Sequence, residues 1–209
     1  MGIAHRLGVL TLLGLSTTAH AEVDWSRGLV MANGVGIADR HAPNPATARG
    51  PARRAAEEAA RRQLTAQLAA LPLAAGGTLK SRLGDKANAE RITRAVDRAI
   101  ALSATLETDG SWRVTLGVPL EAIRLALDAP RELPAAGDPD LPIVIVEGVK
   151  QKPALGVTIG GLAAATLFAR EVPAWAAAAP RVKATGGKAG AITLTEPRGG
   201  PSTLFVLLP

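Results

Sequence analysis

Two runs of alternating apolar and polar residues, separated by an Asp-Gly pair, most constrain the fold of this 209-residue chain. The first run spans Leu102 to Leu106, and the second spans Trp112 to Val118. Alternation with a period of two is typical of strands that bury one face. Asp109 and Gly110, between the runs, tolerate the positive φ angles of a tight turn. The sequence therefore predicts a β-hairpin here, with Trp112 facing the core.

The segments around this hairpin have strand and helix patterns. An apolar run over 28–38 predicts a strand, and its glycines indicate a bulge or a close approach of another backbone. Apolar residues at helical spacing predict helices over 51–71, 87–99 and 119–127. The first helix is expected to begin at Pro51, because proline loses no hydrogen bond in a first helical turn. The predicted order of elements is β-α-α-β-β-α.

The last third of the chain has a different character. Residues 128–141 are rich in Pro, Gly and charged residues and lack periodicity, which is typical of a linker. The uncharged stretch 155–169 is too short and too rich in glycine for a membrane span, so two short strands around a turn are expected there. Five runs bounded by Gly or Pro predict further strands, at 143–146, 154–159, 181–185, 191–195 and 203–208. The prediction is an α+β chain, with a small α/β domain over 22–127 and a β-rich C-terminal module over 142–209.

The first 21 residues have the three parts of a cleavable secretory signal peptide. A basic start precedes an apolar run from Leu7 to Leu15, and small residues stand at Ala19 and Ala21. Cleavage is expected between Ala21 and Glu22. The apolar run is far shorter than the roughly 20 residues that span a bilayer. We therefore expect a periplasmic or secreted protein with no transmembrane segment after processing.

Composition narrows the classes of function. The chain has no cysteine, so neither a disulfide framework nor the acylated cysteine of bacterial lipoproteins is expected. The formal net charge of +6 is modest and scattered, and only two Phe, three Trp and no Tyr are available for stacking on bases. This composition argues against nucleic-acid binding. Peripheral contact with an anionic membrane or cell-wall surface remains open on charge grounds.

Residue types that carry catalysis are scarce. After removal of the signal peptide, His41 is the one remaining histidine, and it falls in a predicted loop. Ser-His-Asp triads, Cys-His pairs and zinc sites therefore lack their usual residues. We predict no catalytic, cofactor-binding or metal-binding residues. Glu107 and Asp109 are the carboxylates that an acid-base mechanism would use, although turn acids are usually structural.

The helix predicted over 51–71 carries opposite charges four residues apart. Arg53 is spaced to meet Glu57, and Arg54 to meet Glu58. Such a pattern is typical of a solvated helix face with ion pairs, and the alternative is an interaction face. The residues of this charged face are Arg53, Arg54, Glu57, Glu58, Arg61 and Arg62.

The Ala/Arg/Glu helix over 52–64, the glycine-marked strand before it and the segment 102–127 after it resemble a known bacterial family. The similarity is to the twenty-kilodalton membrane-associated lipoprotein family of Gram-negative bacteria and to the N-terminal domain of flagellar assembly protein T. The resemblance covers roughly residues 27 to 127. It implies a cell-envelope module with a small α/β domain and no catalytic residues, and this chain departs from the family by lacking the lipidated cysteine.

These observations favour an exported, non-enzymatic cell-envelope protein that binds a protein partner or takes part in an assembly and needs no cofactor. One alternative is a hydrolase of cell-wall polymer that uses Glu107 or Asp109. Another is a small-ligand carrier with an apolar pocket lined by Val157, Ile159 and Leu167.

Overall fold

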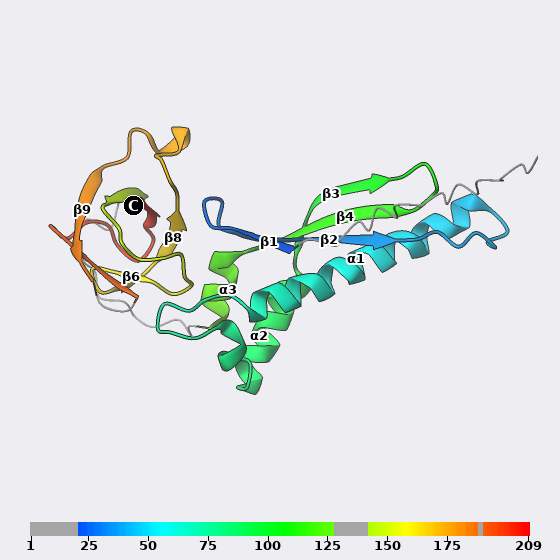
Figure 1. Ribbon diagram of the computed structural model, residues 1–209, viewed down its shortest axis with the longest axis horizontal. Coiled ribbons are helices and arrows are strands. Elements are labelled where there is room, and N and C mark those ends of the chain that lie inside the picture. Colours follow the sequence, from blue (N-terminus) through cyan, green and yellow to red (C-terminus); the bar gives the residue numbers. More distant parts are fainter. Residues whose placement is uncertain (1–20, 128–141, 188–189) are drawn as a thin grey trace, which may run out of the picture.

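The computed structural model describes residues 21–127, 142–187 and 190–209, and it confirms the predicted α+β class (Figure 1). The β-α-α-β-β-α order is present, preceded by one further strand. The expected signal peptide and the expected linker over 128–141 lie outside the described residues, apart from Ala21. The first module consists of β1 (Ala21–Asp24), β2 (Leu29–Gly36), α1 (Pro45–Ala69), a 3-10 turn η1 (Leu79–Arg82), α2 (Lys86–Asp97), β3 (Ile100–Leu106), β4 (Trp112–Pro119) and α3 (Leu120–Leu127).

The four strands of this module form an antiparallel sheet in the order β1-β2-β4-β3. Helix α1 covers one face of the sheet along β2 and β4 (Figure 1). Alternate residues of the two central strands point into this contact, so that Val30, Val114 and Val118 are buried. The module thus has two layers, a sheet and helices on one side of it.

The buried side of α1 is a narrow stripe of small residues facing β2. Its buried members recur every four residues, at Ala48, Ala52, Ala56, Ala60, Leu64 and Leu68. A Cβ atom on Gly34 would lie 1.9 Å from the carbonyl oxygen of Ala56, and one on Gly36 would lie 1.8 Å from that of Ala52. The glycines therefore let the helix and strand backbones touch, so of the two predicted alternatives, a bulge or a close approach, the second is present.

Helix α1 begins six residues before the predicted start. Asn44 is its N-cap, and its Oδ1 accepts a hydrogen bond of 2.8 Å from the amide of Ala46. Pro45 occupies the first helical turn, whereas Pro51 lies inside the helix. The prediction that Pro51 opens the helix was wrong, because an Asn-Pro start two turns earlier already satisfies the rules for a helix N-terminus.

The predicted hairpin is confirmed, with a three-residue connection. The amide of Glu107 donates to the carbonyl of Ser111, and the amide of Gly110 donates to the carbonyl of Glu107. Gly110 has a φ of 83°, the left-handed conformation that closes a three-residue hairpin loop. Trp112 packs against the core of the module, as expected, and its ring lies under the guanidinium of Arg53.

The C-terminal module is a seven-stranded sheet that curves around its own core (Figure 1). The strand order is β7-β6-β10-β9-β5-β11-β8, and strands β9, β5, β11 and β8 run parallel. Its elements are β5 (Ile143–Glu147), β6 (Thr158–Ile159), β7 (Leu162–Ala163), β8 (Ala165–Phe168), a 3-10 turn η2 (Ala174–Ala176), β9 (Arg181–Gly186), β10 (Ala191–Leu194) and β11 (Leu204–Leu207).

The predicted strands of this module are present with two changes. The run 154–159 forms a strand only at β6, because Leu155 is used for a contact with the first module. The stretch 155–169 contains the two expected short strands, β6 and β7, and also β8, which the sequence prediction lacked.

Two sets of contacts join the modules. The amide of Leu155 donates to the carbonyl of Pro72 at 2.9 Å, and the amide of Ala74 donates to the carbonyl of Leu155 at 2.8 Å. The amide of Phe168 donates to the carbonyl of Trp25, and the two aromatic rings meet edge to face at 5.9 Å. Leu155 belongs to the core of the first module and Ala74 to that of the second. The modules therefore exchange buried side chains where they meet.

Candidate interaction surface

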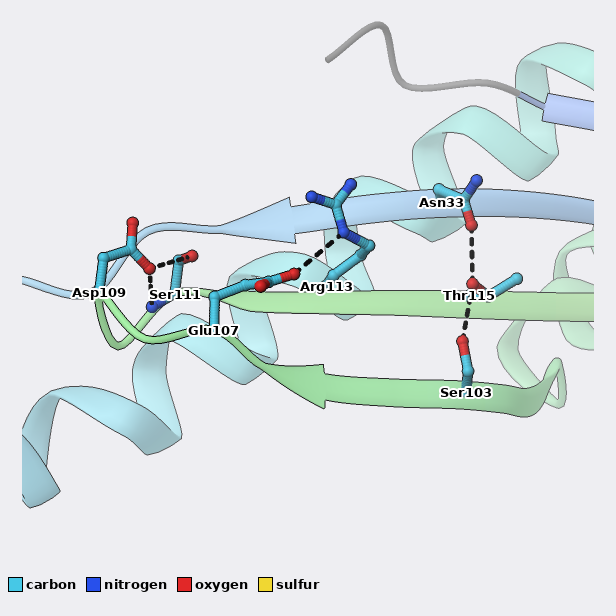
Figure 2. Close-up of polar contacts among 7 residues, drawn as sticks. All are labelled: Asn33, Ser103, Glu107, Asp109, Ser111, Arg113 and Thr115. Atoms are coloured by element: carbon cyan, nitrogen blue, oxygen red, sulfur yellow. Dashed lines mark hydrogen bonds and ion pairs between the residues drawn. The ribbon is translucent and has the colours of Figure 1, made fainter.

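On the side of the first sheet opposite α1, no helix of the described residues lies over the strands, and we call this side the open face. Figure 2 views this face, with α1 behind the strands. Asn33 lies on β2, Arg113 and Thr115 lie on β4, and Ser103 lies on β3. On β2 and β4 these residues alternate with the buried ones beneath α1, since successive side chains of a strand point to opposite faces.

A row of hydrogen bonds crosses the open face from β2 to β3 (Figure 2). The hydroxyl of Thr115 donates to Oδ1 of Asn33 at 2.7 Å, and the hydroxyl of Ser103 donates to that of Thr115 at 2.9 Å. Cross-strand polar pairs of this kind stabilise neighbouring strands and hold their register. The row ends at Ser103, the central residue of β3.

The two carboxylates of the hydrolase alternative are engaged in the hairpin (Figure 2). Glu107 forms an ion pair of 3.2 Å with Arg113 across the strands. Asp109 Oδ1 accepts hydrogen bonds from the hydroxyl of Ser111 at 2.6 Å and from its amide at 3.0 Å. These Ser111 hydrogen bonds hold the pKa of Asp109 below its ordinary value. An acid-base mechanism needs one carboxyl group with a raised pKa, whereas the pKa of Asp109 is lowered.

The Asp109 turn predicts a pH-dependent contribution to stability. Because the pKa of Asp109 is lower in the folded than in the unfolded chain, its contribution is present near neutral pH. The contribution is lost as the pH falls below about 4 and through the lower folded value. Asp109→Asn should therefore lower the free energy of unfolding near neutral pH, and the difference from wild type should shrink in acid.

Chemical denaturation at several pH values measures this difference. Glu58→Gln is the control, because Glu58 lies on the exposed side of α1 and makes no ion pair within the described residues. Its difference from wild type should stay small throughout. A deficit of Asp109→Asn that is the same at about pH 3 as near neutral pH would contradict the assignment.

The outer edge of β3 is the most exposed backbone edge of the first sheet. Strand β3 pairs with β4 on one side and has no partner on the other among the described residues. All seven residues of the strand are exposed, including Ile100 at 53%, Leu102 at 41% and Leu106 at 39%. The strand contains no charged residue and no proline. We call this free side of Ile100–Leu106 the β3 edge.

The alternating pattern of 102–106 predicted a strand but not its position in the sheet. An edge strand and a central strand share the same alternation, so neither the free edge nor the exposure of Leu102 and Leu106 followed from it. The usual signal of a protected edge is a charged residue or a proline within the strand. Its absence from 100–106 was the available indication of a surface that another strand can cover.

The charged face of α1 is solvated, with part of the expected pairing. Glu57 lies 3.2 Å from Arg53 and 4.0 Å from Arg61. The second series forms no ion pair in the described part of the chain, where Arg54, Glu58 and Arg62 are all exposed. Exposed pairs of this kind contribute little to stability. Whether the face binds a partner stays a prediction.

The remaining predicted residues are dispersed. Of the cleavage-site residues, Ala21 and Glu22 lie in β1, paired with Ala32 and Met31, whereas Ala19 lies outside the described residues. His41 is exposed in the loop before α1.

The three residues of the carrier alternative differ in their surroundings. Val157 and Ile159 are fully buried in the core of the C-terminal module. Ile159 also borders a hollow of about 340 Å³ near Gly160 and Arg198, which neither Val157 nor Leu167 lines.

Within residues 21–127, 142–187 and 190–209, no group of three or more His, Cys, Asp or Glu side chains is placed to hold a metal ion. Over the same residues, no helix combines the length and apolar character needed to cross a membrane.

No model of a known protein family matches this chain, and a search of curated proteins gives no significant match.

Proposed function

We propose that this protein is an exported, non-enzymatic cell-envelope protein that binds a protein strand along the β3 edge. The observation that carries the proposal is an uncharged, proline-free edge strand whose seven residues are all exposed. An extended peptide that pairs with such an edge completes its free N–H and C=O groups and covers its apolar side chains.

Two features of the sequence support the location. Residues 1–21 have the pattern of a secretory signal peptide, and the resemblance over residues 27 to 127 is to envelope proteins of Gram-negative bacteria. The absence of cysteine from the sequence favours a protein released into the periplasm or the medium over a lipid-anchored one.

The open face supports a role in binding over one in catalysis. Its carboxylate Glu107 is neutralised by Arg113, and Asp109 is fixed by Ser111. Its polar side chains are hydrogen-bonded to one another along the sheet, which holds the strands in register. Beyond the bulge between Ala101 and Ser103, the edge of β3 carries no charge and no proline, so this part of the strand is suited to pairing with an added strand.

Site-specific photocrosslinking in a Gram-negative host tests the proposal. A photoreactive residue placed at Leu102 or Leu106 of the full chain should give a protein adduct in the periplasmic extract. The matched control position is Glu58, on the exposed side of α1, where no adduct is expected. Adducts at Glu58 with none at Leu102 and Leu106 would transfer the binding role to the charged face of α1. No adduct at any of the three positions would contradict a role in protein binding.

A further inference from the structure

The backbone groups of β3 that face outward can be assigned from the hairpin. The amide of Glu107 donates to the carbonyl of Ser111, so Glu107 directs its backbone groups toward β4. In an antiparallel pair these directions alternate along the strand. Thr105 and Ser103 therefore also face β4, whereas Ala104 and Leu106 direct their N–H and C=O groups to the free side.

The net charges at the two ends of β3 differ in sign. Before the strand stand Arg94, Asp97 and Arg98, all exposed, two basic residues and one acidic. After it stand Glu107 and Asp109, and Arg113 pairs with Glu107, so this end has two acidic residues and one basic. A second β3 strand running antiparallel would place the basic start of each strand beside the acidic end of the other. A parallel arrangement would place like charges together, which is unfavourable.

The place of β3 in the molecule leaves room for a second copy. Strand β1 forms the opposite edge of the first sheet, and the C-terminal module lies at the far end from the β3–β4 turn (Figure 1). Two copies paired antiparallel through β3 would therefore carry their C-terminal modules at opposite ends. Ser103, where the row of hydroxyl groups ends, is the middle residue of the strand and would lie near the two-fold axis.

We infer that the strand bound by the β3 edge is β3 of a second copy, so that two chains form a symmetric dimer with one continuous eight-stranded sheet. This inference rests on the proposed function and names its partner. The symmetry is isologous, since the same surface is used by both copies. Because one strand pair is smaller than a standard protein interface, the dimer should dissociate on dilution.

Sedimentation velocity of the processed chain, from about 1 to about 100 µM, should show a reversible monomer–dimer equilibrium. Ala104→Pro removes an outward N–H while leaving the β3–β4 ladder in place, and it should abolish the dimer. Leu106→Lys should do the same by placing a charge on the edge. The control Leu125→Lys changes a leucine on α3 that is 54% exposed, against 39% for Leu106, and it should dimerise like wild type.

A charge exchange tests the antiparallel geometry without a proline. Arg98→Glu and Glu107→Arg should each raise the dimer dissociation constant about tenfold, because each puts like charges at both ends of the strand pair. An equimolar mixture of the two variants should form a heterodimer with nearly the affinity of wild type. Circular dichroism and thermal unfolding of each variant establish that it remains folded.

Three results would overturn the inference. They are a monomer at every concentration, a dimer that Ala104→Pro and Leu106→Lys leave intact, and a mixture of Arg98→Glu and Glu107→Arg whose dimer dissociation constant is no lower than that of either variant alone. If the chain is monomeric but crosslinks from Leu102 or Leu106 to a different protein, the proposed function stands and only the identity of its partner is wrong.

Discussion

Gly34→Ala is expected to destabilise the first module by about 3 kcal/mol, at the upper end of the cost of overpacking a core. A methyl group at this position would lie 1.9 Å from the carbonyl oxygen of Ala56 and 2.5 Å from the amide nitrogen of Ala60. Both atoms belong to the backbone of α1, so no change of side-chain rotamer can relieve the contact. The helix would have to move away from the sheet, and the stripe of buried alanines would lose its packing.

Urea denaturation followed by circular dichroism measures this loss. The matched control is Gly84→Ala, because a Cβ atom there has no heavy atom within 4 Å beyond its chain neighbours. That change should alter the free energy of unfolding by less than about 0.5 kcal/mol. Equal effects of the two substitutions would contradict the direct contact between the α1 and β2 backbones.

Leu155→Ala is expected to cost about 3 kcal/mol and to weaken the first module, although Leu155 follows the expected linker in sequence. Its side chain is buried in the core of the first module. Its backbone amide and carbonyl are bonded to Pro72 and Ala74, so the truncated side chain would leave a cavity that the fixed backbone hinders from closing.

Hydrogen exchange locates the effect. Amides of η1 and of the C-terminal half of α1 should exchange faster in Leu155→Ala than in wild type, because these elements belong to the core into which the Leu155 side chain packs. Leu125→Ala is the control, since Leu125 is 54% exposed on α3 and should cost less than about 0.5 kcal/mol. Faster exchange confined to the C-terminal module would show that the two cores are independent.

The Leu155 contact illustrates why the assembly of the modules was not predicted from sequence. Leu155 was included in a predicted strand because it lies in an apolar run bounded by Gly and Pro. The structure uses it in a single bridge to Leu73, a residue 82 positions earlier, and such pairings leave no periodic signal.

The candidate surface was predictable only in part. The hairpin of β3 and β4, the inward position of Trp112 and the structural role of the turn acids follow from local alternation and from turn chemistry. The free edge of β3 does not follow from local sequence. It results from the strand order β1-β2-β4-β3, in which β2 pairs with β4 and leaves β3 at the edge, and this pairing joins strands that are distant in the sequence.

The sequence by itself determined the α+β class and most of the elements, since these depend on residues near one another in the chain; for the glycines of β2 it left a bulge and a close backbone contact both open. The prolines predicted the start of α1 less well, because both Pro45 and Pro51 are compatible with a first helical turn. Only the tertiary structure decided that β3 lies at an edge, that its apolar side chains remain exposed and that Leu155 and Ala74 pack into each other's modules. These features depend on which segments, distant in the sequence, come into contact. Those contacts are decided by the packing of the whole fold, so no local stretch of sequence specifies them.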